Sequence, residues 1–514
     1  MAGPVKDRFM RTLLKKVVQT GALAGKLSPE SVRGAFSGID GLVVPSVTVT
    51  DRGIFVLVEP DGDERLAVLS HYPGTLTGFH GEVYTESDGG KTLYLLAAPL
   101  DHQNAVQLRA ILPHTGPVPL ECRESFGTGD RIGSRGAATP GHIEAIRKSS
   151  LTPVLAQQSV RENHKTGRSF ENVMADVTWS VFREGYISEW GSDADHLKTI
   201  EDIDTAVQAG FTMFTIDPSE KIDNDADTYS DEVLSRKFDA LFPDIKKGET
   251  FIDRYEGSGG ASRREVVRSG VKYLNAIRHA ALAYRHLAGL FGESRFNFEL
   301  SIDETRTATS VLDHRIIATE LALDEVNLFS LAPRFEGDFE KGIDYRGSIE
   351  GFSRSLRAHY ALSRQLGNYR LSLHSGSDKF SIYPLFGEIT DGFFHVKTAG
   401  TSYLEAVKAA ASEDFDLFRR ILSLSIETFE ENAASYQISA DVHRAPDPSG
   451  LSRDEALRLI ADDPDVRQVL HIAFGVVLRT MGDELRNTLR THRETYKKFL
   501  VSHIGKHISL LTGR

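Results

Sequence analysis

The stretch "FNFELSID", residues 296–303, decides the fold. Successive side chains of a strand point to opposite faces, so counting in steps of two separates three apolar residues from Glu299, Ser301 and Asp303. The run starts apolar and finishes with carboxylates. In a barrel of parallel strands the apolar set faces the surrounding helices, the polar set points inward, and the strand ends carry the chemistry. We therefore expect Glu299, Ser301 and Asp303 to face the axis of such a barrel.

Seven other short apolar runs share this character, and helical patterns follow most of them. In chain order they are "PLECRES" (119–125), "TPVLAQQSV" (152–160), "ADHLKT" (194–199), "FTMFTID" (211–217), "VNLFSLAPR" (326–334), "RLSLHS" (370–375) and "GFFHVKT" (392–398). Strands that alternate with helices pair in parallel through crossover connections. Eight of them predict an α/β fold, a closed (β/α)₈ TIM-like barrel.

The sequence patterns along the chain predict three regions. Residues 1–115 begin with a helical pattern and continue as short alternating runs separated by turns, which indicates a mostly β accessory domain. Residues 116–412 carry the catalytic barrel, with a partly helical insert at 218–295 that could cover the site or another subunit. Residues 413–514 form a helical extension that completes the outer ring, caps the barrel or joins subunits of a homo-oligomer.

Composition excludes several classes of function. The net charge of −12 argues against nucleic acid as a partner, because phosphate binding needs a basic surface. The single cysteine, Cys122, rules out an intrachain disulfide and a cysteine-based zinc cluster, and it fits a cytoplasmic location. No apolar run approaches the roughly 20 residues that span a bilayer, so no membrane partner is expected.

The ends of the eight runs are ionisable or polar, and this asymmetry is the strongest functional signal. In chain order they supply Glu124, Gln158, His196 with Lys198, Asp217, Glu299 with Asp303, Arg334, His374, and His395 with Lys397. Counting in steps of two places His196 with Lys198, and His395 with Lys397, on one face each. Three histidines and several carboxylates should therefore converge near one axis.

Such a set suits a divalent metal: Zn, Mn, Ni or Co. We expect Glu299, His374 and His395 as its ligands. The plainer interpretation is that each histidine is a hydrogen-bonded core residue and that Lys198 and Lys397 merely neutralise buried carboxylates. The glycine-rich segment 125–136 matches neither phosphate-loop spacing, and the chain has no dinucleotide fingerprint, so no nicotinamide cofactor is expected.

The segment "RLSLHSGSDKFSIYP", residues 370–384, shows how one strand end could serve both metal and substrate. His374 should point inward as a ligand, and Gly376 should let the backbone turn away. Ser375 and Lys379 are then placed to bind sugar oxygens. The full set of expected substrate-binding residues is Gln158, His196, Asp217, Arg334, Ser375, Lys379 and Lys397.

Several long motifs together resemble one family. They are "SFGTGDRIGSRGAATPGHIEAIR", "VLAQQSVREN", "DADHLKT", "LAPRFEGDFEKGIDYRG", "LSLHSGSDKFSIYP" and "HVKTAGTSYLEA". They resemble the bacterial tagaturonate/fructuronate epimerases of hexuronate catabolism, from about Glu121 to Leu404. The resemblance implies a metal-dependent isomerase that interconverts the keto-uronic acids D-tagaturonate and D-fructuronate, and that can accept related ketohexoses.

The two uronates differ at a carbon that the ketone does not acidify directly, so simple deprotonation is unattractive. A retro-aldol step through a metal-stabilised enediolate, followed by aldol closure on the opposite face, solves this. We expect Asp303 and Glu124 to act as base and acid, with Lys198 as helper, and Arg334 or Lys397 to hold the substrate carboxylate. The alternatives are another metal-dependent barrel enzyme on sugars, an aldolase or ketose isomerase, and a non-catalytic sugar-acid-binding protein.

Overall fold

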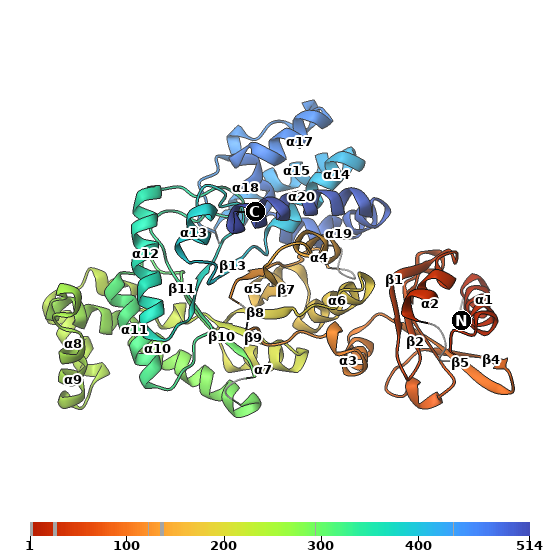
Figure 1. The fold of residues 1–514 in the computed structure, drawn as a ribbon. Helices are drawn as coiled ribbons and strands as arrows, with labels where there is room; N and C mark the ends of the chain where they lie inside the picture. Colours follow the sequence, from red (N-terminus) through yellow and green to blue (C-terminus); the bar gives the residue numbers. More distant parts are fainter. Residues whose placement is uncertain are drawn as a thin grey trace.

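The centre of the molecule is a closed barrel of eight parallel strands (Figure 1). The computed structural model describes residues 4–23, 28–121, 123–133, 138–292, 295–434 and 436–513. Around the barrel the strand order is β10-β11-β12-β13-β6-β7-β8-β9. The strands are β6 (Ser125–Gly127), β7 (Thr152–Ser159), β8 (Gly191–Leu197), β9 (Met213–Ile216), β10 (Asn297–Ile302), β11 (Ser330–Pro333), β12 (Arg370–Leu373) and β13 (Phe394–Lys397). The (β/α)₈ prediction is confirmed.

The first strand lies later in the chain than predicted. The run 119–125 was expected to form this strand and to end it at Ser125, but β6 begins at Ser125. The preceding residues lie under the barrel instead: the Leu120 amide donates to Asn297 Oδ1 at 2.6 Å, and Asn297 donates back to the Leu120 carbonyl at 3.0 Å. Leu120 also packs with residues from the beginnings of other strands, so its apolar run plugs the bottom of the barrel.

Several helices of the outer ring begin at side-chain caps. Ser169, Thr199 and Ser310 each accept a hydrogen bond from a backbone amide of the first turn, and residues three positions later bond back. The ring contains α4 (Thr139–Ile146), α5 (Val160–Thr166), α6 (Phe170–Arg183), α7 (Ile200–Ala209), α11 (Val311–Leu323), α12 (Ile349–Leu366), α13 (Tyr383–Ile389) and α14 (Thr401–Glu413).

The N-terminal part is a five-stranded antiparallel sheet with helices on both faces. Its order is β1-β2-β3-β5-β4, from β1 (Leu42–Val49), β2 (Ile54–Val58), β3 (Arg65–Ser70), β4 (Glu82–Asp88) and β5 (Lys91–Pro99). Helices α1 (Pro4–Thr20) and α2 (Pro29–Phe36) cover one face. The other face packs on α3 (His102–Ile111) and on Trp179 and Phe182 of α6, which joins this part to the barrel.

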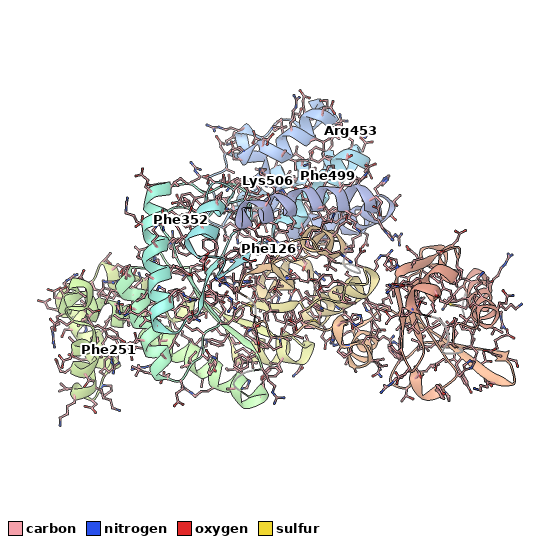
Figure 2. All side chains as sticks on the ribbon, viewed as in Figure 1. Phe126, Phe251, Phe352, Arg453, Phe499 and Lys506 are labelled. Atoms are coloured by element: carbon pink, nitrogen blue, oxygen red, sulfur yellow. The ribbon has the colours of Figure 1, made fainter. Side chains whose placement is uncertain are left out.

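The insert between β9 and β10 adds three helices to the side of the barrel. They are α8 (Asp231–Leu241), α9 (Ile245–Tyr255) and α10 (Arg263–Phe291). Helix α10 packs against α11, while α8 and α9 form an outlying pair at the edge of the molecule, where Figure 2 labels Phe251. The pair therefore lies on the flank, away from the N-terminal sheet at the opposite edge.

The C-terminal helices close the ring and rise beside the strand ends (Figure 1). They are α15 (Phe415–Glu427), α16 (Phe429–Ala433), α17 (Arg453–Asp462), α18 (Pro464–Ile472), α19 (Phe474–Thr491) and α20 (Arg493–Thr512). Helix α20 packs on α4, α13 and α14, so the last helix of the chain contacts the first helix of the barrel.

Within the part of the chain that the structure describes, no helix combines the length and apolar character needed to cross a bilayer.

Candidate functional site

A polar pocket of about 670 Å³ opens at the C-terminal ends of the barrel strands. Its walls come from the ends of β7, β8, β10, β11, β12 and β13, from the loop after β11, and from the C-terminal extension. Asp195, His196, Asp303, His374 and Lys397 all line it. The predicted convergence of histidines and carboxylates at one end of the barrel is therefore present.

A bulge in β8 brings two consecutive side chains into this pocket. The pairing of β8 with β9 shifts register between Ala194 and Leu197. Within this bulge His196 has a φ of 56°, a left-handed conformation that a non-glycine residue adopts only when its surroundings impose it. Asp195 and His196 consequently both reach the pocket, where the Asp195 Oδ1 and His196 Nδ1 atoms are 2.8 Å apart.

His374 at the end of β12 lies between two carboxylates of β10 and its loop. Its Nε2 is 2.6 Å from Glu299 Oε1, and its Nδ1 is 3.3 Å from Asp303 Oδ1. Its ring centre is 5.3 Å from that of His196. The two imidazoles thus stand side by side above a buried glutamate.

Lys397 at the end of β13 forms the floor beneath them. Its Nζ lies 2.7 Å from Asp193 Oδ2, 2.8 Å from Asp195 Oδ1 and 2.7 Å from Glu299 Oε1. A buried ammonium needs such partners, because uncompensated charge inside a protein costs several kcal/mol, on the order of 3–5 kcal/mol when one partner is removed. The strand ends therefore share one continuous ionic network.

This network sets the protonation of the site. Burial disfavours the imidazolium of His196, but Asp195 and Asp303 outweigh it and raise the pKa of His196 to about 10. Burial likewise opposes the charge on His374, yet Asp303 and Glu299 raise its pKa. Burial would also raise the pKa of Asp303, but His374 and His196 hold it far below its usual range. Asp303 is therefore an ionised acceptor at neutral pH.

The donor atoms fit a divalent metal ion. Asp195, His196 and His374 each offer one ligand atom, and these three atoms lie within 4.8 Å of one another. Two imidazoles and a carboxylate form a donor set that suits Zn²⁺, Mn²⁺, Co²⁺ or Ni²⁺. Asp195, which the strand-end pattern did not single out, thus belongs to a candidate ligand group in the pocket.

Six of the predicted site residues line the same pocket. They are His196, Asp303, Arg334, His374, Ser375 and Lys397. Ser375 has a φ of 48° and accepts a hydrogen bond from Lys341 Nζ at 2.9 Å. Arg334 donates to the backbone carbonyl of Thr305. Their roles toward metal and substrate remain predictions.

Two of the predicted catalytic residues lie elsewhere. Glu124 directly precedes β6, so it sits at the start of the strand, beside Gly392 just ahead of β13, at the opposite end of the barrel from the pocket. Lys198 was expected to share a face with His196, but the β8 bulge breaks the period-two pattern. Its Nζ approaches Ser219, Glu220 and Asp217 on the loop after β9 instead.

Gln158 and Asp217 also fall outside the residues that line the pocket. The neighbouring Gln157 lines it and donates to Asp195 Oδ2 at 3.2 Å, whereas Gln158 is fully buried. Asp217 is buried and accepts from the Ser219 amide at 2.9 Å. It still lies near His196 and Glu304, at the margin of the site.

Lys379 was expected to bind substrate, but its ammonium is fully buried and used structurally. It donates to the backbone carbonyls of Glu340, Ile343 and Ser377 at 2.8, 2.6 and 2.9 Å. Three donors meet three acceptors, so none remains for a sugar. Burial lowers the pKa of Lys379 to about 8.

Two of the three predicted metal ligands lie below the pocket. His395 bonds through Nδ1 to Ser125 Oγ at 2.8 Å, one layer deeper in the barrel, and burial lowers its pKa to about 3. Glu299 is fully buried and contacts Lys397, Thr215, Ser330 and His374. It supports His374 from beneath, the position of a residue that orients a ligand rather than one that faces the cavity.

Sequence patterns missed the part of the wall that strands do not supply. Arg131, Glu162, Lys341, Tyr436 and His471 all line the pocket. They come from loops, from α5 and from the C-terminal extension, where period-two counting carries no signal. Arg131 belongs to the glycine-rich segment whose residues 134–136 lie outside the described residues.

Comparisons with known proteins agree on one family. A family model described as UxaE, tagaturonate epimerase, matches residues 44–511. A tagaturonate/fructuronate epimerase of Thermotoga maritima is 40% identical over 419 residues, which cover 80% of this chain and 86% of the relative.

Solved structures give the same result. The glycerol-complexed crystal structure of the fructuronate-tagaturonate epimerase UxaE from Cohnella laeviribosi matches with a TM-score of 0.84 at 34% identity, covering 93% of this chain and 98% of that one. The native crystal structure of the same enzyme gives a TM-score of 0.83 at 33% identity and covers 97% and 99% of the two chains.

Proposed function

This chain belongs to the tagaturonate epimerase family, and from this premise we propose that it interconverts D-tagaturonate and D-fructuronate in the cytoplasm. One observation carries the proposal: Asp195, His196, Asp303 and His374 converge in a single pocket at the C-terminal ends of the barrel strands. A cavity of about 670 Å³ is of the size that holds a small metabolite.

We propose that Asp195, His196 and His374 hold a divalent metal ion, with Glu299 orienting His374 from below. Such an ion would polarise the substrate ketone and the hydroxyl next to it, and so ease the opening of the neighbouring carbon–carbon bond. Lys397 keeps Asp195 ionised: burial alone would raise the pKa of this carboxyl, but His196 and Lys397 hold it well below its usual range.

Asp303 is the proposed base of a retro-aldol step. Its ionised carboxylate takes the proton from the hydroxyl one carbon beyond the carbon next to the ketone. That oxygen becomes an aldehyde, the carbon–carbon bond breaks, and its electron pair moves onto the ketone oxygen to leave an enediolate. The aldehyde rotates, the bond re-forms on its other face, and the new alkoxide takes back a proton. Atoms, electrons and charge are conserved.

A second carboxylate is needed because rotation carries the oxygen away from Asp303. Glu124 cannot serve, since it lies at the other end of the barrel. Glu304 follows Asp303 in the chain, lines the same pocket and lies 3.6 Å from Arg161. We propose that Glu304 receives the proton from Asp303 and gives it to the new alkoxide, so that both carboxylates end the cycle ionised, as they began it. Ser375 and Arg334 are placed in the pocket to bind substrate oxygens.

Purified protein incubated with D-tagaturonate and a panel of divalent metals tests the proposal. Proton NMR should show D-fructuronate appearing until equilibrium is reached. Chelation should abolish turnover, and one or more of Zn²⁺, Mn²⁺, Co²⁺ and Ni²⁺ should restore it. Full activity of a metal-free protein would contradict the metal site.

The same NMR spectra separate the competing functions. Accumulation of three-carbon fragments would indicate an aldolase, and appearance of an aldose would indicate a ketose isomerase. Binding without any new product would indicate a sugar-acid-binding protein. The converging acid, base and imidazole groups favour turnover over binding alone.

A further inference from the structure

One wall of the pocket carries two cationic side chains, Arg334 and Lys341, that form no ion pair among the described residues. Both lie on the loop 333–342 after β11, whose acidic residues Glu336, Asp338 and Glu340 do not line the pocket. The Lys341 ammonium donates to Ser375 Oγ at 2.9 Å, and within the described ranges no carboxylate lies within 4.0 Å of it. By contrast, Arg161 and Arg306 on the same rim face Glu304 and Asp225. The Lys341 side of the pocket is therefore open to an anionic ligand.

His471, from α18 of the C-terminal extension, stands beside Lys341 with a fixed proton. Arg131 Nη1 lies 3.1 Å from His471 Nε2, and a guanidinium can only donate, so Nε2 is the acceptor and the proton resides on Nδ1. Glu162 bonds to the other end of Arg131 and holds it in place. Burial, and then the charges of Arg131 and Lys341, keep the pKa of His471 well below its ordinary value.

The Nδ1–H of His471 is a buried donor without a partner among the described residues. Two pocket-lining glycines frame the ring. A Cβ on Gly342 would stand 3.3 Å from Nδ1, and one on Gly400 would stand 2.6 Å from Cε1. Buried donors are nearly always hydrogen-bonded. The Nδ1–H of His471 therefore needs an acceptor that the described residues do not provide. Arg131 Nε, in the same wall, is also buried and unpaired.

The backbone that carries Lys341 is held rigidly from behind. Buried Lys379 donates to the carbonyls of Glu340 and Ile343, and buried Arg467 donates to the carbonyl of Gly342 at 2.7 Å. Gln468 reaches the Lys341 carbonyl at 3.3 Å. An ammonium on such a fixed loop loses little conformational freedom when a ligand binds, which is how preorganised sites gain affinity.

We propose that Lys341 and the Nδ1–H of His471 form the seat for the carboxylate of the uronate, and that this seat sets the preference for keto-uronates over neutral ketoses. The proposal rests on the proposed function and adds its specificity determinant. Lys341 and His471 take the carboxylate-binding role that we expected of Lys397. The Lys397 ammonium is already surrounded by three carboxylates, which would repel the carboxylate of the substrate. Arg334, on the same loop, adds charge to this wall.

Two non-reacting competitors test the seat directly. Borohydride reduction of D-tagaturonate gives an aldonate, and reduction of the neutral ketose D-tagatose gives an alditol that lacks the carboxylate. Their dissociation constants are measured by titration calorimetry on the metal-loaded enzyme. Lys341→Met should weaken aldonate binding about ten- to hundredfold, as expected for loss of a charge-assisted contact. Alditol binding should change less than about threefold, because no charge is lost from that contact.

His471 variants separate the donor from its structural role. An asparagine amide can occupy the position of Nδ1–H, whereas a glutamine amide occupies that of Nε2. His471→Gln should therefore weaken aldonate binding about tenfold, and His471→Asn should stay within about threefold of wild type. Arg306→Gln is the matched charge control, because its guanidinium already pairs with Asp225 at 2.5 Å.

Unchanged aldonate binding in both Lys341→Met and His471→Gln would overturn the seat, as would an equal loss for aldonate and alditol. A different result would contradict the proposed function. If wild-type enzyme does not convert D-tagaturonate, the epimerase assignment is wrong, yet the two competitors still decide whether this wall recognises a carboxylate.

Discussion

At the scale of single residues, His374 is the side chain on which the site depends most. It touches Glu299 below and Asp303 beside it, and its ring stands against His196. His196, Asp303 and Glu299 are thus all in contact with this imidazole. Substitution of His374 should therefore alter the geometry and the charge balance of the whole site.

Replacing His374 by alanine should remove a proposed metal ligand and leave the fold intact. We expect kcat/KM to fall at least about a thousandfold, in line with the loss of a group essential to catalysis. NMR assays and metal analysis of the purified variant provide the measurement. His395→Asn is the matched control, because an asparagine amide can still bond to Ser125; its activity should stay within about tenfold of wild type. Equal losses in the two variants would contradict the assignment.

His503 on α20 should make stability depend on pH. It lies between Asp378 and Glu405, with Arg467 and His507 also facing the cluster. Burial opposes its charge, but Glu405 and Asp378 raise its pKa. A raised pKa means that this contribution is complete below about pH 6.5 and is lost as pH rises through the folded value.

The free energy of unfolding of wild type should therefore fall above about pH 6.5, by up to about 1.4 kcal/mol per pH unit while His503 deprotonates. Melting temperatures between pH 5 and 9 measure this, and His503→Gln should flatten the decline. His80→Gln, at a half-exposed histidine beside Asp101, should leave the profile as in wild type. A wild-type profile that rises from pH 6.5 to 8 would contradict the expectation.

Residue positions followed from the sequence wherever a strand is regular. On β10 and β12 the period of two correctly turned Asp303 and His374 toward the axis. The period of two failed on β8, because a bulge adds a residue that the sequence pattern does not indicate. It also could not show that the Lys379 ammonium is fully used by backbone carbonyls, since two of those partners, Glu340 and Ile343, lie 39 and 36 residues away in the chain. Long-range contacts of this kind are set by packing and leave no local pattern.

At the scale of elements, α13 and α20 approach each other closely at a glycine. A side chain on Gly387 would overlap the Leu511 carbonyl, and one on Gly141 of α4 would stand 2.7 Å from Leu500 Cβ. Glycine at these positions lets the last helix lie directly on its neighbours. Both contacts depend on backbone approach, which sequence patterns do not reveal.

Gly387→Ala should therefore destabilise the protein, by about 1–3 kcal/mol, because α20 must shift away from α13. Gly505→Ala within α20 is the matched control: nothing lies within 4 Å of its Cβ position, so the gain in helix propensity should stabilise by up to about 1 kcal/mol. Denaturant unfolding measures the change in the free energy of unfolding for each variant. If both variants changed it equally, the close contact between α13 and α20 would not limit the side chain at position 387.

At the scale of the whole molecule, the N-terminal sheet is joined to the barrel by a shared core. Phe55, Leu57 and Leu66 pack against Trp179 and Phe182 of α6. At the edge of this core Arg183 pairs with Glu64, and Arg493 of α20 lies 3.1 Å from Glu59. The sheet therefore covers apolar surface that belongs to the barrel's own helix.

A chain that begins at residue 101 should aggregate or lose stability, because Trp179 and Phe182 become exposed and Arg183 loses its carboxylates. Size-exclusion chromatography and thermal melting test this. The same truncation with Trp179→Gln and Phe182→Gln should regain solubility, since the exposed patch is then polar. A truncated chain that remains monodisperse with the wild-type melting temperature would contradict a shared core.

The packing of α20 on α4 also has a consequence for synthesis on the ribosome. Helix α4 ends at Ile146, and its cover begins at Arg493, roughly 350 residues later. At about 5–20 residues per second, the apolar face of the first barrel helix waits on the order of 20 to 70 s before its partner emerges. His471, which lines the pocket, also follows α4 by roughly 325 residues. The nascent chain therefore has its proposed metal ligands long before the pocket is complete, and we expect it to need a chaperone during that interval.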